Sequence, residues 1–284
     1  PITSATNDAA GSVGDAIVAD RQPGVDLLPR RRMTIRNLLA PGQTESNLIE
    51  YIQETGFSNN AAPTEEGGAK PQSDIKFELL SAPVRTIPHT MKASKQVLSD
   101  VSQLRSMIDG ALLYGLDFAE ELQLLNGDGT GQNLNGLVTQ ATAYSAPLTI
   151  ADATPIDNLR LASLQAVLAE YPASGIVLHP TDWAWIELQK DGDGRYIIGN
   201  PQGTLSPTMW SLPVVSTQAM ETDKFLVGAF GAAQIFDRWE SRIEVGYEND
   251  DFTKNMVTIL AEKRLAMAVR RPEAFIFGDF GRVA

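Results

Sequence analysis

Residues 102–125 read SQLRSMIDGALLYGLDFAEELQLL, and residues 126–137 continue the chain as NGDGTGQNLNGL. In the first stretch, apolar side chains recur at the spacing of one helix face, which predicts a single amphipathic helix. At 1.5 Å per residue this helix would be about 36 Å long. Asn126-Gly127 supplies a stop signal. The glycines that follow predict turns that lead out of the helix into another domain.

Upstream of this helix, two apolar stretches flank a long polar one. Residues 48–57 and 75–80 predict strands. Between them lies SNNAAPTEEGGAKPQSD, residues 58–74, which is too polar and too rich in glycine to pack. Two strands around so long a tip predict an extended hairpin, which is unusual for a monomer. Such a hairpin either binds a partner or invites proteolysis.

Downstream of the glycine-rich stretch, helices and a buried strand are predicted. Thr154 can cap a helix near residues 155–170, and Pro155 suits its first turn. GIVLHP, residues 175–180, predicts a buried strand. A further helix is expected to begin there, with Thr181 as its cap.

The two ends of the chain differ in character. From Leu212 onward short strands dominate, and a last long strand near residues 256–269 resumes the domain that the chain left at residue 131. Residues 1–29 carry too little apolar surface for a core of their own and predict an extended arm. The whole pattern predicts an α+β fold.

The composition is that of a folded protein, with 43% apolar and 20% charged residues. There is no cysteine, and the only histidines, His89 and His179, lie far apart, so we expect no disulfide, no metal site and no cofactor. No apolar run reaches the roughly eighteen residues that a membrane span needs. The net charge of −12 argues against a general nucleic-acid binder. The one dense basic run, Arg30 to Arg32, is interpreted as a solvated or carboxylate-paired hinge.

Six segments occur in an order that is typical of one known family. Together they resemble the major capsid proteins of tailed bacteriophages of the Hong Kong 97 type, over essentially the whole chain. The segments are TIRNLLAPG (34–42), LQLLNGDGTGQNLNGL (122–137), ASGIVLHPTDW (173–183), GRYIIGNPQ (194–202), MWSLPVV (209–215) and KNMVTILAEKRLA (254–266). Each segment alone is a weak signal, and their collinear order is the specific one.

The resemblance implies four regions. They are an N-terminal arm (1–30), a peripheral domain with the long helix (31–47, 81–131 and 232–270), an extended loop (48–80) and an axial domain (132–231 and 271–284). It also implies an N-terminal scaffolding region that a phage protease removes. Pro1 fits the start that such a cleavage leaves.

The resemblance also implies the function and the partners. The chain would be a structural protein, not an enzyme, whose copies form pentamers and hexamers in an icosahedral shell around double-stranded DNA. It would bind that DNA without sequence specificity and would meet a portal, a head protease and decoration proteins, with no membrane involved. Assembly would take place in the host cytoplasm, and the mature location would be the virion. The alternatives are an encapsulin-like compartment shell of the same fold and, from another class, a soluble hydrolase that uses Glu262 or a pair of aspartates.

Three residues fall where this family keeps its crosslinking groups. They are Lys70 in GGAKP, Asn255 at the start of the last long strand, and Glu262 within that strand. A lysine amine attacks an amide carbonyl only as the free base, so burial and a nearby carboxylate are needed to take its proton. Because Glu262 has apolar neighbours in sequence, such as Leu260, we expect a raised pKa that suits a general base.

The spacing of the last two residues adds a constraint. Asn255 and Glu262 are seven residues apart, which in one strand means about 23 Å and opposite faces. We therefore expect Lys70, Asn255 and Glu262 to come from different subunits, so that the reaction waits for assembly. Trp239 is a candidate wall for the site.

Each of these residues also has an ordinary interpretation. Lys70 would be a solvated loop lysine, and Glu262 a salt-bridge partner of its neighbours Lys263 and Arg264. Glu65 and Glu66, which precede Lys70 in the hairpin tip, are interpreted as solvating charges.

Overall fold

The computed structural model describes residues 28–100, 102–198 and 207–282. The chain divides after Arg32 into two units, of which the second, residues 33–284, is compact. Most of the predicted arm, residues 1–27 with Pro1, lies outside the described residues, and residues 28–32 carry neither helix nor strand. All helices and strands of the described chain belong to the second unit.

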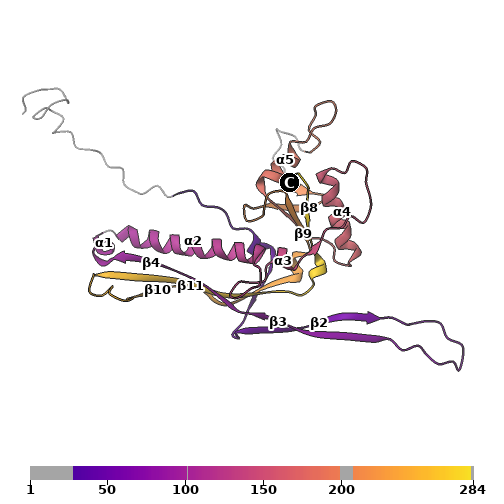
Figure 1. The fold of residues 1–284 in the computed structure, drawn as a ribbon, viewed down its shortest axis with the longest axis horizontal. Coiled ribbons are helices and arrows are strands. Elements are labelled where there is room, and N and C mark those ends of the chain that lie inside the picture. The colour runs from indigo at the N-terminus through magenta and orange to yellow at the C-terminus, as the bar shows by residue number, and fades with distance from the viewer. Residues whose placement is uncertain (1–27, 101, 199–206, 283–284) are drawn as a thin grey trace, which may run out of the picture. The chain divides into compact units, whose positions relative to one another are not determined.

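The helix predicted at 102–125 is confirmed as α2 (Ser102–Asn126), which follows the short α1 (Lys95–Asp100). It lies along a sheet with the strand order β1-β10-β11-β4 (Figure 1). The strands are β1 (Ala40–Gln43), β10 (Ala233–Gly246), β11 (Met256–Val269) and β4 (Arg85–Ser94). The apolar stripe of α2 consists of Ile108, Leu112 and Leu116, and it is buried against Ile259 and Ala261 of β11. This stripe fixes which side of the helix faces the sheet.

Charged side chains are buried between the helix and the sheet. Glu120 of α2 forms salt bridges with Lys263 of β11 and with Arg36. Arg36 lies on η2 (Ile35–Leu38) and also pairs with Asp237 of β10. Glu120 and Lys263 are buried, so each depends on the other for compensation. The network joins the helix, both central strands and the segment that leads into the sheet.

The second sheet has six strands in the order β5-β12-β9-β6-β8-β7. They are β5 (Thr142–Ala143), β12 (Phe275–Asp279), β9 (Lys224–Gly228), β6 (Gly175–Leu178), β8 (Leu212–Ser216) and β7 (Thr208–Met209). The predicted strand in GIVLHP is confirmed as β6, and all its residues are buried. The remaining short elements are α3 (Leu137–Gln140), η3 (Phe230–Ala232) and η4 (Pro272–Ala274).

The two predicted helices of this region are present, one with a different cap. α4 (Pro155–Leu168) is capped by Thr154, whose hydroxyl accepts from the Asp157 amide at 3.3 Å, as expected. α5 (Pro180–Glu187) begins before Thr181, so the prediction of Thr181 as its cap was wrong. The cap is His179, whose Nδ1 accepts from the Thr181 amide at 3.1 Å. Proline suits the first helical position, which moves the cap to the preceding residue.

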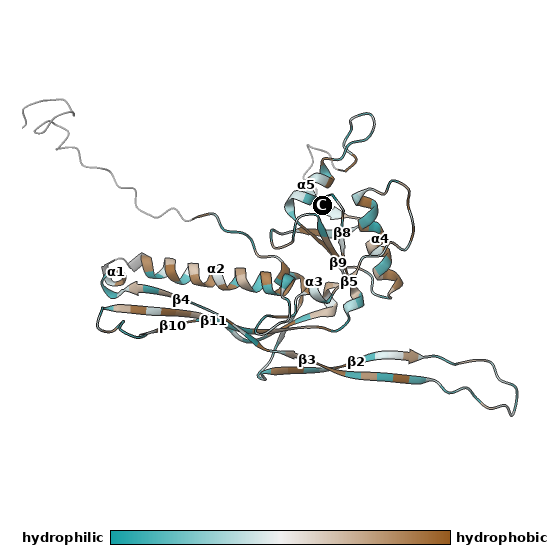
Figure 2. Cartoon of the chain, in the orientation of Figure 1, coloured by the Kyte–Doolittle hydropathy of each residue, from teal (hydrophilic) through white to brown (hydrophobic). Residues whose placement is uncertain are grey.

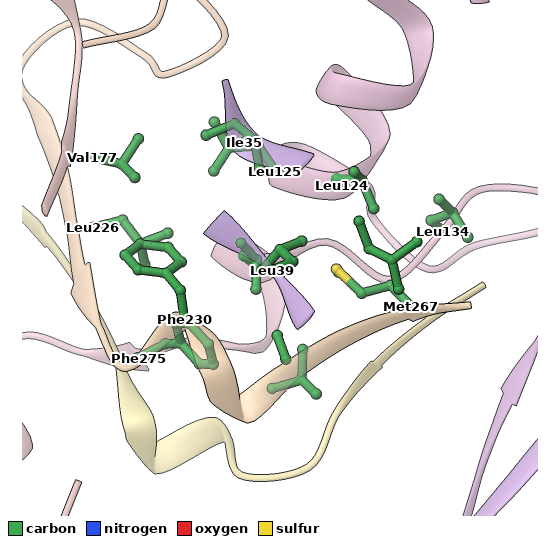
Figure 3. Close-up of a cluster of buried hydrophobic side chains, with 14 of the residues drawn as sticks. Ile35, Leu39, Leu124, Leu125, Leu134, Val177, Leu226, Phe230, Met267 and Phe275 are labelled. Atoms are coloured by element: carbon green, nitrogen blue, oxygen red, sulfur yellow. The ribbon is translucent and has the colours of Figure 1, made fainter. Parts of the chain in front are cut away.

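One buried cluster takes residues from both sheets and from the end of α2 (Figure 3). It contains Leu124 and Met267, from the predicted peripheral domain, and Val177 and Leu226, from the predicted axial domain. The two regions thus share a core within the second unit. The exact division between them remains a prediction.

The predicted extended hairpin is formed by β2 (Leu48–Ser58) and β3 (Asp74–Pro83), an antiparallel two-stranded sheet. At its base the Tyr51 hydroxyl donates to the Val269 carbonyl at 3.2 Å, and Arg271 donates to the Glu54 carbonyl at 2.7 Å. Beyond the base the hairpin continues away from the first sheet (Figure 1), and hydrophobic residues occur along its strands (Figure 2). Several of these side chains are exposed, among them Ile52, Phe57, Phe77 and Leu79. Exposed apolar surface of this extent on a hairpin indicates contact with a partner.

Replacing Glu120 with leucine should lower the free energy of unfolding of the isolated subunit by about 3–5 kcal/mol, because it leaves the Lys263 ammonium buried without its close carboxylate. Adding Lys263→Met should recover most of that loss. Asp117→Asn is the matched control, since Asp117 is 3.7 Å from the same ammonium but half exposed, and should cost about 1 kcal/mol or less. Urea denaturation followed by circular dichroism measures all three, and a Glu120→Leu subunit as stable as wild type would contradict the prediction.

Candidate crosslinking site

Lys70 lies in the polar tip of the hairpin, residues 59–73, and its side chain is exposed. The tip turns where the Gly68 amide donates to the Glu65 carbonyl at 3.0 Å, next to Gly67 at a φ of +86°. Glycine adopts this left-handed conformation without steric cost. The amine of Lys70 is therefore presented to solvent and to any neighbouring molecule.

Asn255 lies in a tight turn. The sequence predicted it at the start of the last long strand, but in the structure it precedes that strand. Its φ is +54°, and β11 begins only at Met256. The Asn255 carbonyl accepts from the Lys95 amide at 3.0 Å, and the Met256 amide donates to the Asp251 carbonyl at 2.8 Å. Asparagine tolerates the left-handed region better than most residues. Backbone bonds on both sides thus fix the position of an exposed amide side chain.

The turn is anchored by the Asp251 carboxylate. It accepts from the Thr258 hydroxyl at 2.6 Å, from the Glu248 amide at 3.0 Å and from the Lys92 ammonium at 3.1 Å. The Thr258 hydroxyl is the main reason that the pKa of Asp251 lies below its usual range, and the Glu248 amide is the next. The anchor is therefore charged at neutral pH, where it holds the turn against β11.

Glu262 does not have the apolar surroundings expected from its neighbours in sequence. Its carboxylate accepts from Arg242 Nε at 2.7 Å and also pairs with the terminal amine of that guanidinium. The ordinary interpretation as a salt-bridge partner thus describes the single chain, but with Arg242 in place of Lys263 or Arg264. Lys263 points to the other face of the sheet, toward α2, because successive side chains of a strand alternate between faces.

Arg242 and its aromatic support were missed from the sequence. Arg242 is the cross-strand partner of Glu262 in the β10–β11 pairing. Its guanidinium lies 4.0 Å from the ring centroid of Trp239, and that of Arg264 lies 4.6 Å from the same ring. Trp239 is therefore covered by arginines in the single chain. To predict the pairing of Arg242 with Glu262 from the sequence, the register between β10 and β11 would have to be known.

The structure does not bring Lys70, Asn255 and Glu262 together. In Figure 1 the tip of the β2–β3 hairpin and the turn between β10 and β11 lie at opposite ends of the drawn fold. Glu262 is well inside β11, about 20 Å along the strand from the turn that holds Asn255. A single chain in this conformation cannot join the three groups, so any reaction between them would require at least two chains.

Other kinds of site find little support in the part of the chain that the structure describes. Within it, no three carboxylate or imidazole side chains are grouped as metal ligands. None of its helices is both long enough and apolar enough to span a membrane.

A family model described as the phage capsid family matches residues 13–280. The major capsid protein of Enterobacteria phage HK97 is 49% identical over 273 residues, which cover 95% of this chain and 71% of that protein. Among solved structures, the capsid of the native GTA particle has a TM-score of 0.78 at 19% identity, covering 99% of each chain. A chain from Microbacterium phage Oxtober96 has a TM-score of 0.74 at 10% identity, covering 95% of this chain and 98% of its own.

The left-handed conformation of Asn255 makes a stability prediction. Asn255→Val should lower the free energy of unfolding by about 1–2 kcal/mol, because a β-branched residue is disfavoured at a φ of +54°. Asn255→Gly should stay within about 0.5 kcal/mol of wild type, because glycine accepts this conformation. Urea denaturation of the isolated subunit compares them, and equal stability of the two variants would mean that the turn is not held in this conformation.

Proposed function

We propose that neighbouring copies of the chain are joined covalently by an isopeptide bond between Lys70 and Asn255. The proposal starts from the family, since the chain belongs to the phage capsid family and has the Hong Kong 97 capsid fold. The chain is a structural major capsid protein that assembles with itself into a shell, and its place is the virion. The encapsulin-like alternative is not favoured, because a close relative is a phage capsid protein. The proposal concerns the chemistry that holds the shell together and what the shell meets.

The bond-forming step is an acyl transfer. The Lys70 Nζ attacks the side-chain carbonyl carbon of Asn255, a new C–N bond forms, and the bond to the amide nitrogen breaks. Glu262 accepts one proton from the Lys70 ammonium, the attacking nitrogen gives up a second proton to the departing nitrogen, which leaves as ammonia, and Glu262 then releases its proton to solvent. Because ammonia is lost to bulk solvent, the bond is permanent in practice.

Two features support this assignment of roles. Lys70 is exposed at the tip of a hairpin that extends away from the rest of its chain, and Asn255 is fixed in a hydrogen-bonded turn. A fixed electrophile and an amine that reaches outward suit a reaction between molecules, since holding one reactant in place lowers the entropic barrier. Glu262 lies far from both Lys70 and Asn255 of its own chain. This agrees with a site in which the base comes from a different copy than the two residues that it helps to join.

We further propose that the shell is icosahedral, built from pentamers and hexamers, and that it encloses double-stranded DNA. The net charge of −12 suits a container that must not bind its contents tightly, because like charges repel the phosphate backbone. A portal, a head protease and decoration proteins would be its other partners. Assembly would take place in the host cytoplasm.

Denaturing gel electrophoresis of boiled, assembled particles tests the crosslink. Wild-type shells should give ladders or material too large to enter the gel, whereas Lys70→Arg and Asn255→Asp should give the 30.7 kDa monomer. Arginine keeps the positive charge but is not a free-base nucleophile, and aspartate keeps the shape of the turn residue while removing the amide leaving group. Glu262→Gln should assemble normally but crosslink about a hundredfold or more slowly.

Particle size, measured by gel filtration, is the control that all three variants still assemble. Mass spectrometry of digested wild-type shells should find a joined peptide that lacks one ammonia. Monomer bands alone from assembled wild-type particles would contradict the crosslink and leave the capsid assignment intact.

A further inference from the structure

We propose that the acidic hairpin tip of a neighbouring copy, Glu65 and Glu66, takes Arg242 away from Glu262 and so releases Glu262 to act as the base. This inference rests on the proposed crosslink and adds how the site is switched on. It identifies the surface around Trp239 as the receiving face, and the hairpin tip of a second copy of this chain as its occupant.

The need for such a step comes from the pairing of Glu262 in the single chain. Its carboxylate is bonded to two nitrogens of Arg242, and only 14% of its side chain is exposed. The guanidinium occupies one oxygen of this carboxylate, and its positive charge opposes the approach of a second cation, the ammonium of Lys70. For Glu262 to take the proton of an ammonium, the guanidinium has to find another partner.

The receiving face has an excess of cationic donors. Arg242 and Arg264 both lie over the ring of Trp239, and Arg238 lies 5.8 Å from its centroid. Among the described residues, the carboxylates of the same chain that pair with this group are Glu262 and Glu244, and both pair with Arg242, Glu244 at 3.4 Å. Three guanidiniums thus meet two carboxylates of their own chain at this face, and each guanidinium can bind a carboxylate through two hydrogen bonds.

The hairpin tip has the complementary charge. Glu65 and Glu66 are exposed, and none of the ion pairs among the described residues involves them. They are the only two adjacent carboxylates in the tip, residues 59–73. Opposite charge on the two surfaces favours this docking over other contacts and sets its register.

The distances allow both events at once. Glu66 precedes Lys70 by four residues, so an extended tip can separate them by at most about 14 Å. Lys70 has to approach Glu262 to hand over its proton, and Arg242 Nε is 2.7 Å from Glu262. Once Lys70 is in place, Glu66 lies within about 14 Å of it and Glu65 within about 18 Å, a span that can include Arg242. The exchange leaves Arg242 paired and leaves Glu262 next to the incoming ammonium.

The test is an interaction between two sets of substitutions, read as the rate of crosslinking on denaturing gels after assembly. Glu65→Gln/Glu66→Gln should slow crosslinking about tenfold or more. Asp74→Asn/Glu78→Gln is the matched control, because it removes the same charge from exposed positions of the same hairpin, and should crosslink within about twofold of wild type. In an Arg242→Met background, removing Glu65 and Glu66 should change the rate by less than about twofold, because no guanidinium then has to be displaced.

Three results would overturn the proposal. They are a tip variant that crosslinks as fast as wild type, a control that slows as much as the tip variant, and a full loss that persists in the Arg242→Met background. If the Arg242→Met variant does not assemble, the dependence of the crosslinking rate on salt concentration tests the proposal instead. Crosslinking of the wild type should slow as sodium chloride screens the hairpin tip from the arginine face. The crosslinking rate of the Glu65→Gln/Glu66→Gln variant should not change with salt. Equal salt dependence of the two rates would overturn the proposal.

The proposed crosslink and this switch fail in different ways. Wild-type shells that never crosslink overturn both. Wild-type shells that crosslink through Lys70 and Asn255 while ignoring Glu65 and Glu66 overturn the switch alone.

Discussion

The buried salt bridge between Lys263 and Glu120 decides which way β11 faces. Side chains alternate along a strand, so a slip of one residue would exchange the two faces completely. With Lys263 tied to α2, Glu262 has to point to the opposite face of the sheet, where Arg242 and Trp239 lie. An apolar residue at position 263 would also pack under the helix but would specify this register less sharply, because a buried ammonium has to meet a carboxylate, whereas an apolar side chain has only a volume to fill.

The two residues of the proposed crosslink differ in how firmly their own chain holds them. Asn255 is surrounded by backbone hydrogen bonds and by the fully bonded Asp251 carboxylate. Lys70 stands on a two-stranded hairpin whose base is tied by Tyr51 and Arg271 and whose tip is exposed. Fixing one partner and extending the other lets the geometry of the assembly, and not of the subunit, determine when they meet.

Local signals in the sequence predicted the local structure well. The apolar spacing of 102–125 and the cap at Thr154 depend on residues a few positions apart, and both were confirmed. The cap at His179 was missed because Thr181 is the commoner cap type, although Pro180 already marked the first helical position. The hairpin was predictable because the polar, glycine-rich stretch between its two strands cannot pack, which leaves the strands to pair with each other.

The surroundings of the candidate base could not be predicted in the same way. Sequence neighbours placed Glu262 among apolar residues, but the side chain that meets it belongs to its cross-strand partner, which the neighbours in sequence do not reveal. Its environment is set by Arg242, twenty residues earlier, through a register that includes irregularities near Trp239. The left-handed turn at Asn255 likewise depends on Lys95, from a distant part of the chain.

In the proposed scheme, the ion pair between Arg242 and Glu262 also prevents crosslinking before assembly. Loss of ammonia makes the weld irreversible, so a bond formed between free subunits would fix a wrong contact permanently. A glutamate held by Arg242 in the free subunit is closed to a second cation, whereas the Arg242 side chain is 42% exposed and can be reached by the carboxylates of a neighbour. Chemistry that waits for a neighbour's carboxylates would therefore start only where the neighbour is already docked, and assembly errors could still be corrected before that point.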